Sequence, residues 1–229
     1  MSKGNPIYDI TPFTLLDYPD KTACIIWYAG CNMRCGYCYN PDIVLGKGKI
    51  SIEEVLQFLN SRKGLLDGVV MSGGECTMHP SLTDFALEVK ALGMEVKIDT
   101  NGSRPEVLKK LYENNTLDYV ALDFKATPQK FHSITKSDLF SPFEKSLSFL
   151  IDNNIPFEVR TTVHSKQLTS HDICKMRDYL HEKGYKGTYF LQHYVNDAKT
   201  IEKLESSDKR ILNQAFSSKN MEVAIRSSL

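Results

Sequence analysis

Three cysteines carry the clearest chemical signal in this sequence. Cys31, Cys35 and Cys38 lie in the segment CNMRCGYC with the spacing Cys-x3-Cys-x2-Cys. Thiols clustered this closely, in a chain without secretory features, favour metal binding over disulfides. Three thiolates on a four-iron cluster leave one iron open to a substrate. The alternative is a zinc site completed by Cys24, Cys76 or a histidine, which are far apart in the sequence.

The composition favours a globular cytoplasmic protein. The chain has 229 residues, of which 41% are hydrophobic, and its 28 Lys+Arg balance 28 Asp+Glu. A balanced charge argues against a general binder of nucleic acid or of anionic membranes. No apolar run approaches the ~20 residues of a membrane span. The start MSKGNPIYDI lacks the apolar core of a signal peptide, so we expect a cytoplasmic protein with reduced thiols.

The rest of the sequence alternates between short apolar runs and helical periods. A capping box, Ser51 with Glu54, marks the start of the first helix. Crossovers of helix length imply parallel strands, so the expected fold class is α/β. Strands are expected at 22–29, 68–72, 94–100, 118–124, 156–163, 187–193 and 221–226, and helices at 51–62, 81–93, 105–114, 141–153, 170–183 and 207–217.

Six strand–helix units are fewer than the eight of a closed barrel. The pattern itself leaves two architectures open, a partial barrel and a doubly wound sheet. We expect one domain over 1–229, with an N-terminal extension (1–20), a barrel core (21–200) and a C-terminal helix and tail (201–229).

Both architectures bind ligands at the carboxyl ends of their strands, and the chemically capable residues follow that rule. The cysteine loop follows the first strand and SGGEC the second. The third strand ends in DTNG, the fourth in DFK and the sixth in Gln192–His193, while Arg160 lies in the fifth. The sequence therefore predicts a ligand site along this edge.

The cysteine loop and its flanks resemble a known family. CNMRCGYC looks like the signature of the radical S-adenosylmethionine superfamily. The longer stretch FTLLDYPDKTACIIWYAGCNMRCGYCYNPDIV is similar to anaerobic ribonucleoside-triphosphate reductase activating proteins, which are glycyl radical enzyme activases. Asp20 and Tyr39 depart from the glycine and histidine common there. The resemblance extends through all six units and implies a radical SAM core, a partial (β/α)6 TIM-type barrel.

The resemblance implies an oxidoreductase with Cys31, Cys35 and Cys38 holding a [4Fe–4S] cluster at the catalytic centre. The cluster would cleave S-adenosylmethionine reductively, and the resulting radical would take hydrogen from a glycine of anaerobic ribonucleotide reductase. A flavodoxin or a ferredoxin-type protein would supply the electron. The alternatives are an activase of another glycyl radical enzyme, such as pyruvate formate-lyase, a radical SAM enzyme for a small molecule, and a zinc-binding interaction module.

The resemblance also implies cofactor contacts from the cysteine loop and the second strand. Tyr37 would present its aromatic edge and backbone to the ligand. Gly73, Gly74 and Glu75 would hold the methionine amino group, since glycine lets a ligand approach the backbone closely. The alternative is an ordinary turn with a solvated glutamate. Cys76 is interpreted as an inert buried thiol.

Further cofactor contacts are expected from the remaining strands. Asp123 and Lys125 would lie beside the cofactor, and Asp99 and Asp123 would share a monovalent cation near the methionine carboxylate. Lys125 would meet that carboxylate or a ribose hydroxyl, with a plain ion pair to Asp123 as the alternative. Arg160 needs an anion, either the cofactor carboxylate or a neighbouring acidic residue. His193 matches a histidine near the cofactor of such activases, although a lone histidine is more often structural.

Overall fold

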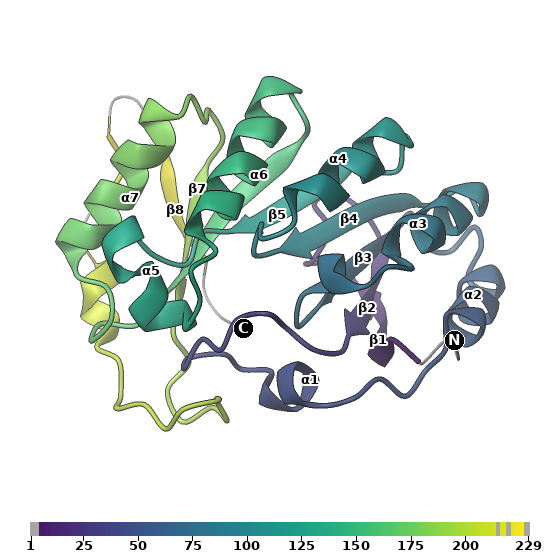
Figure 1. Ribbon diagram of the computed structural model, residues 1–229, viewed down its shortest axis with the longest axis horizontal. Coiled ribbons are helices and arrows are strands. Elements are labelled where there is room, and N and C mark those ends of the chain that lie inside the picture. The colour runs from purple at the N-terminus through teal and green to yellow at the C-terminus, as the bar shows by residue number, and fades with distance from the viewer. Residues whose placement is uncertain (1–4, 214–215, 219–220, 227–229) are drawn as a thin grey trace. The chain divides into compact units, whose positions relative to one another are not determined.

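The computed structural model describes residues 5–213, 216–218 and 221–226 (Figure 1). The chain divides into two compact units. The first unit takes its described residues from 1–32, 40–100 and 104–120, and the second takes them from 33–39, 101–103 and 121–229.

Four strands follow one another through the first unit. They are β1 (Ile7–Thr14), β2 (Ala23–Tyr28), β3 (Gly68–Gly73) and β4 (Glu95–Thr100). β1 pairs antiparallel with β2, whereas β2, β3 and β4 pair in parallel. The interiors of β2 and β3 are almost wholly buried, as parallel strands covered on both faces require.

Strand β1 lies inside the stretch 1–20 for which the sequence indicated no element. Its sequence IYDITPFT contains Pro12, which lacks the N–H that a central strand must donate. Pro12 falls in the irregular part of the pairing, between the partners of Thr11 and Thr14. The strand therefore forms at a position where a proline is tolerated.

The helices of the first unit adjoin one another along its strands. Helix α2 contacts α3, and α3 in turn contacts α4 and β4 (Figure 1). The predicted capping box is confirmed: the Ser51 hydroxyl accepts the Glu54 N–H at 3.2 Å, and the Glu54 carboxylate accepts the Ser51 N–H at 2.7 Å. The elements are α1 (Pro41–Leu45), α2 (Ile52–Ser61), the 3-10 turn η1 (Cys76–Met78), α3 (Leu82–Ala91) and α4 (Pro105–Glu113).

The second unit continues the alternation of strands and helices. Strand β5 (Tyr119–Asp123) crosses the boundary between the units, and β6, β7 and β8 pair in parallel. Stacked aromatic rings fill the core, with Phe124 and Phe143 centred 4.9 Å apart. The remaining elements are α5 (Pro128–Thr135), α6 (Phe140–Asp152), β6 (Phe157–Val163), α7 (Ser170–Glu182), β7 (Tyr189–His193) and β8 (Val223–Arg226).

The α-helix predicted at 207–217 is wrong over the described residues. Only a 3-10 turn, η2 (Lys209–Leu212), forms there, and positions 214–215 lie outside the described part. The Asp208 carboxylate accepts both the Arg210 N–H, at 2.9 Å, and the Arg210 guanidinium. Such local side-chain bonds compete with the helical hydrogen bonds of the backbone. The other predicted strands and helices are confirmed within one or two residues of their ends.

None of the helices in the described residues combines the length and the apolar character that crossing a membrane would need.

Candidate functional site

In the first unit, the ends of β2 and β3 lie side by side. Tyr28 and Gly73 are partners in register, and beyond them the Gly74 N–H donates to the Tyr28 carbonyl at 2.9 Å. A side chain at Gly74 would meet the Gly30 carbonyl oxygen at 1.9 Å and the Cys31 Cβ at 3.2 Å. The packing of the two chains therefore requires glycine at position 74 and brings it against the first predicted cluster ligand.

Glu75 is a buried side chain, not the solvated glutamate of an ordinary turn. Its side chain is 1% exposed. One carboxylate oxygen accepts the Thr77 N–H at 3.2 Å, the Thr77 hydroxyl at 2.5 Å and the Thr100 hydroxyl at 2.7 Å. The Glu75 N–H donates to the Gly30 carbonyl at 2.9 Å. These bonds fix the position of the Glu75 carboxyl group at the end of β3.

Asp99 lies near the end of β4, next in the chain to Thr100. Its two oxygens accept the Lys97 ammonium at 2.7 Å and the Ser72 hydroxyl at 3.3 Å. The Lys97 side chain is only 2% exposed. Lys97 was not predicted as a site residue. Its position two residues before Asp99 puts both side chains on the same face of β4, which could have indicated the pair.

Cys76 and His79 also make hydrogen bonds near the ends of β2, β3 and β4 in the first unit. The Cys76 thiol donates to the Met71 carbonyl at 3.3 Å and to the Asp99 carbonyl at 3.5 Å, and burial raises its pKa well above the ordinary value. It is therefore a neutral structural thiol, consistent with the interpretation as inert. His79, which no pattern singled out, lies with Nε2 2.7 Å from the Ala29 carbonyl. Burial lowers the pKa of His79, so a neutral imidazole holds the end of β2.

In the second unit, Asp123 is the centre of an ion triad. Its carboxylate accepts the Arg160 Nε–H and the Lys125 ammonium, each at 2.8 Å. Both local alternatives thus occur: Lys125 pairs with Asp123, and Arg160 finds a neighbouring carboxylate. Burial would raise the pKa of Asp123, but the two cations hold it at about 2. The pKa of Lys125 is raised because Asp123 outweighs the opposing effect of burial. The triad keeps a net charge of +1.

Neutralising Asp123 should make the protein less stable at neutral pH and less sensitive to acid. A carboxylate whose pKa falls on folding stabilises the protein above the unfolded value, near 4, and loses that contribution as the pH falls through the folded value, about 2. We expect Asp123→Asn to cost about 2 kcal/mol at pH 7. Urea unfolding followed by circular dichroism at pH 7, 4 and 2.5 measures this. The variant should lose little further stability below pH 4.

A matched control for Asp123→Asn is Asp178→Asn, which removes a carboxylate paired with Arg177 but 56% exposed. Exposed pairs contribute about 0–1 kcal/mol. Equal losses in the two variants at pH 7 would contradict the role of the triad.

The second and third predicted cluster ligands belong to the second unit. Cys35 and its neighbour Tyr37 are buried, and the Cys38 N–H donates to the Cys35 carbonyl at 3.0 Å, closing a tight turn. Burial raises the pKa of the Cys35 thiol, and the charge of Lys125 opposes that rise. Within the described part of the chain, the structure gathers no three Cys, His, Asp or Glu side chains in a metal-binding arrangement, so the ligand role of the cysteines stays a prediction.

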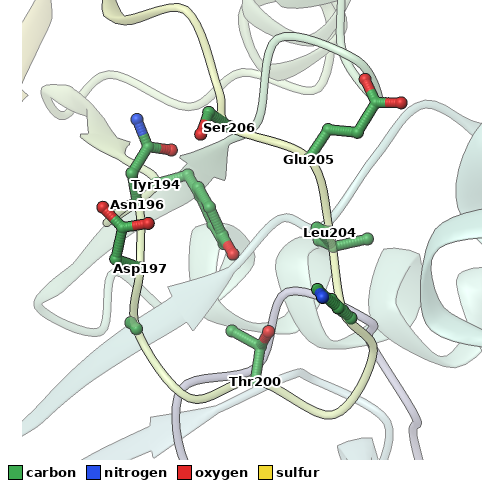
Figure 2. Close-up of a pocket in the computed structure, with 9 residues that line it drawn as sticks. Tyr194, Asn196, Asp197, Thr200, Leu204, Glu205 and Ser206 are labelled. Carbon is green, nitrogen blue, oxygen red and sulfur yellow. The ribbon is translucent and has the colours of Figure 1, made fainter.

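The loop Asn196–Ser207, which follows β7, holds the cysteine loop in place. Its ends are joined because the Asn196 side chain accepts the Ser207 N–H at 2.7 Å and donates to the Ser207 carbonyl at 3.0 Å. At its far end, the Glu202 N–H donates to the Gly36 carbonyl at 3.0 Å. Figure 2 shows the hollow between the two arms of this loop, with the Tyr194 ring pointing into it.

Tyr39, one of the two departures from the family pattern, ties the same segments together. Its hydroxyl oxygen accepts the Val195 N–H at 2.7 Å and lies 3.5 Å from the His193 carbonyl. His193 itself ends β7, and burial together with Lys209 lowers its pKa. The imidazole is therefore neutral near pH 7.

The residues present fit a sulfur-liganded iron cluster and a zwitterionic cofactor. Three cysteines supply soft ligands. Gly74 lets the segment after β3 approach Gly30 and Cys31 closely. The first unit also offers the buried Glu75 carboxyl group, and the second offers the Asp123, Lys125 and Arg160 triad.

Comparison with known proteins supports the same chemistry. Residues 25–180 match the model of the radical SAM superfamily. A protein of Methanocaldococcus jannaschii, named as a glycyl-radical enzyme activating enzyme, is 34% identical over 171 residues, covering 72% of this chain and 70% of its own. The pyruvate formate-lyase-activating enzyme of Clostridium pasteurianum is 34% identical over 130 residues, covering 52% of each chain.

Solved structures support the fold. Streptococcus suis SuiB bound to S-adenosylmethionine has a TM-score of 0.65 at 13% identity, over 88% of this chain and 51% of SuiB. The anSMEcpe structure with bound AdoMet has a TM-score of 0.60 at 20% identity, over 73% of this chain and 49% of its own. This chain thus spans about half the length of each, and the predicted α/β fold of the partial-barrel type is confirmed.

The family uses a [4Fe–4S] cluster and S-adenosylmethionine, which leaves the zinc-binding module without support. With 156 of its residues, 25–180, matching the superfamily model and an activating enzyme at 34% identity, the chain belongs to the radical SAM superfamily, among the glycyl-radical enzyme activating enzymes.

Proposed function

We propose that this protein generates the glycyl radical of an anaerobic ribonucleoside-triphosphate reductase. The observation that carries the proposal is the stretch FTLLDYPDKTACIIWYAGCNMRCGYCYNPDIV, which combines the cluster motif with flanks similar to the activating proteins of that reductase. We propose a cytoplasmic protein, with a flavodoxin or ferredoxin-type protein as electron donor.

Cys31, Cys35 and Cys38 would hold the [4Fe–4S] cluster. Cys31 lies shortly after β2, beside Gly74. The turn of Cys35 and Cys38 bonds to the loop Asn196–Ser207 through Gly36. When bound, the cluster and S-adenosylmethionine supply the one-electron cleavage that makes a radical able to take hydrogen from glycine. The protein binds and orients the reactants and excludes water.

Charged residues in each unit are proposed contacts for the methionine part of the cofactor. In the first unit, Glu75 would meet the ammonium, and Asp99, paired with Lys97, would also contact the cofactor. In the second, Lys125 and Arg160, both paired with Asp123, would meet the carboxylate.

Tyr37 and His193 complete the proposed cofactor contacts. Tyr37 would act through its backbone and ring, because its hydroxyl is buried. His193 would act as a neutral hydrogen-bonding group, because its pKa is lowered.

Glu75→Gln should weaken S-adenosylmethionine binding while leaving the iron content unchanged. Glutamine keeps an acceptor for the Thr77 and Thr100 hydroxyls but removes the charge offered to the ammonium. Losing a charge-assisted hydrogen bond costs about 1.5–3 kcal/mol, which is roughly a 10- to 150-fold rise in Kd. Anaerobic calorimetric titration measures it. An unchanged Kd would remove the proposed role of Glu75.

The partner is tested by offering the enzyme two candidates. The anaerobically reconstituted protein is mixed with reductant, S-adenosylmethionine and either an anaerobic ribonucleotide reductase or a pyruvate formate-lyase from the same source. A glycyl radical signal in electron paramagnetic resonance, formed on the reductase alone, supports the proposal. A signal on the lyase alone would replace it with the second candidate, which the Clostridium pasteurianum relative favours.

A further inference from the structure

In the second unit, strands β6, β7 and β8 carry two rows of side chains on the face of the sheet that bears Arg160. Arg160 is in register with Phe190 of β7. Two residues further along each strand, Thr162 is in register with Gln192, and Gln192 with Arg226. Side chains two residues apart share a face of a strand, so both rows lie on the same side. The second row is nearer to the carboxyl ends of the strands, where parallel sheets bind their ligands.

Arg226, at one end of the second row, is directed back along the strands. Its guanidinium donates to the two carboxylate oxygens of Glu158, at 2.8 and 2.6 Å, and lies 3.8 Å from the centre of the Phe190 ring. Glu158 is only 3% exposed. A buried, two-pronged ion pair of this kind holds both side chains in one position. Its fixed partner for Arg226 is therefore Glu158, on the far side of Phe190 from Gln192.

Thr162 and Gln192 form the polar part of the second row. Both are half-buried, whereas Thr161, Val163 and Leu191, which alternate with them on the opposite face, are buried. Neither the Thr162 hydroxyl nor the Gln192 carboxamide has a hydrogen-bonding partner among the residues that the structure describes. A few polar groups placed on a partly open face are what fix the orientation of a ligand.

The chemistry of these two side chains matches that of a peptide backbone. An activating enzyme of this family acts on a glycine within a protein chain, and glycine has no side chain to recognise. The groups that remain are the peptide N–H, a donor, and the peptide carbonyl, an acceptor. The carboxamide of Gln192 can donate and accept at once, and the Thr162 hydroxyl can do either. Neighbouring strands lie about 4.8 Å apart, so the two side chains can bind the same short segment.

We propose that Thr162 and Gln192 bind the backbone of the substrate protein beside the glycine that gives up its hydrogen. Arg160, a proposed contact of the cofactor carboxylate, lies two residues before Thr162 on the same face of β6. The bound segment would therefore lie next to S-adenosylmethionine, a placement that rests on the proposed function. Because the contacts are with peptide groups, the inference holds whether the reductase or pyruvate formate-lyase supplies the glycine.

The inference is tested by binding, without radical chemistry. Fluorescent peptides with the glycine-loop sequences of the reductase and of the lyase are titrated with the anaerobically reconstituted protein and S-adenosylmethionine, without reductant, and fluorescence anisotropy gives the Kd. Gln192→Met keeps the length of the side chain and Thr162→Val keeps its shape, but neither new side chain can form the hydrogen bond. Each variant should raise the Kd of the bound peptide about 2- to 12-fold. An unchanged Kd in both variants would overturn the proposal, as would a wild type that binds neither peptide.

Two controls separate a contact with the peptide from other effects. Gln57→Met makes the same chemical change at an exposed position of helix α2, and it should leave the Kd of the peptide unchanged. The Kd of S-adenosylmethionine, measured by calorimetry, should stay at the wild-type value in Gln192→Met and in Thr162→Val. A parallel rise in the Kd of S-adenosylmethionine would assign the two side chains to the cofactor and overturn the proposal.

A second measurement changes the peptide instead of the protein. In two further peptides, an ester replaces the amide before or after the glycine, which removes one N–H donor and weakens one acceptor. At least one ester should bind the wild type about 2- to 12-fold more weakly than the amide. That loss should shrink in Gln192→Met or in Thr162→Val, because the contact is already gone. Equal losses in the wild type and both variants would contradict the inference. None of these readouts involves a radical, so a failure here is distinguishable from a failure of the proposed activity.

Discussion

Replacing Cys31, Cys35 and Cys38 together with alanine is expected to abolish iron binding and cleavage of S-adenosylmethionine while leaving the protein folded. The three thiols are the proposed ligands of the cluster, and none of them lies within a strand or helix. Iron and acid-labile sulfide per chain should fall to background, together with the brown colour of the anaerobic protein. Far-ultraviolet circular dichroism should be unchanged.

The matched control is Cys174→Ala, which removes a partly exposed thiol from helix α7. It should keep the wild-type iron content and cleavage rate. Cys24 and Cys76 are poor controls because both are buried in the core. Retained cofactor cleavage in the triple variant would refute the assignment of the cluster ligands. Zinc in stoichiometric amount without sulfide in the wild type would refute the cluster itself.

Gly74→Ala is expected to destabilise the protein and to disturb the segment that holds Cys31, because the added methyl group has no room there. The new methyl group would overlap the Gly30 carbonyl oxygen, at 1.9 Å, so two backbone segments would have to separate. Overpacking of this kind costs typically 1–3 kcal/mol, and a backbone clash puts this variant at the upper end, about 3 kcal/mol. For a chain of this size that corresponds to a fall in Tm of about 6–12 °C.

Gly36→Ala makes an instructive comparison because its clash is with a flexible group. There the new methyl group would meet the end of the Glu202 side chain, at 2.6 Å, which can rotate away for about 1 kcal/mol. Thermal unfolding of both variants and the wild type gives the comparison. If Gly74→Ala were no less stable than Gly36→Ala, the close approach of Gly74 to Gly30 would not hold in solution.

The contact between the loop Asn196–Ser207 and the cysteine segment could not be predicted from the sequence. The loop follows a strand that the sequence predicted, but its contact with Gly36 joins segments more than 160 residues apart, which no local pattern indicated. The helix predicted at 207–217 was wrong for a similar reason, because contacts outside the helical pattern decide the backbone there. Its periodicity is helical, but Asp208 binds Arg210 and Ser217 accepts the Val223 N–H at 3.0 Å, which turns the chain toward β8.

Local signals in the sequence determined the cysteine spacing, the strand–helix alternation and the order of the chemically capable segments along the strand ends. These follow from periods of two and 3.6 residues and from short motifs, which a single segment carries by itself. Only the tertiary structure decided that Glu75 is buried, that Asp123 has two cationic partners and that Lys97 is an internal cation. Burial and charge pairing depend on which distant segments cover a side chain, and no local pattern records that.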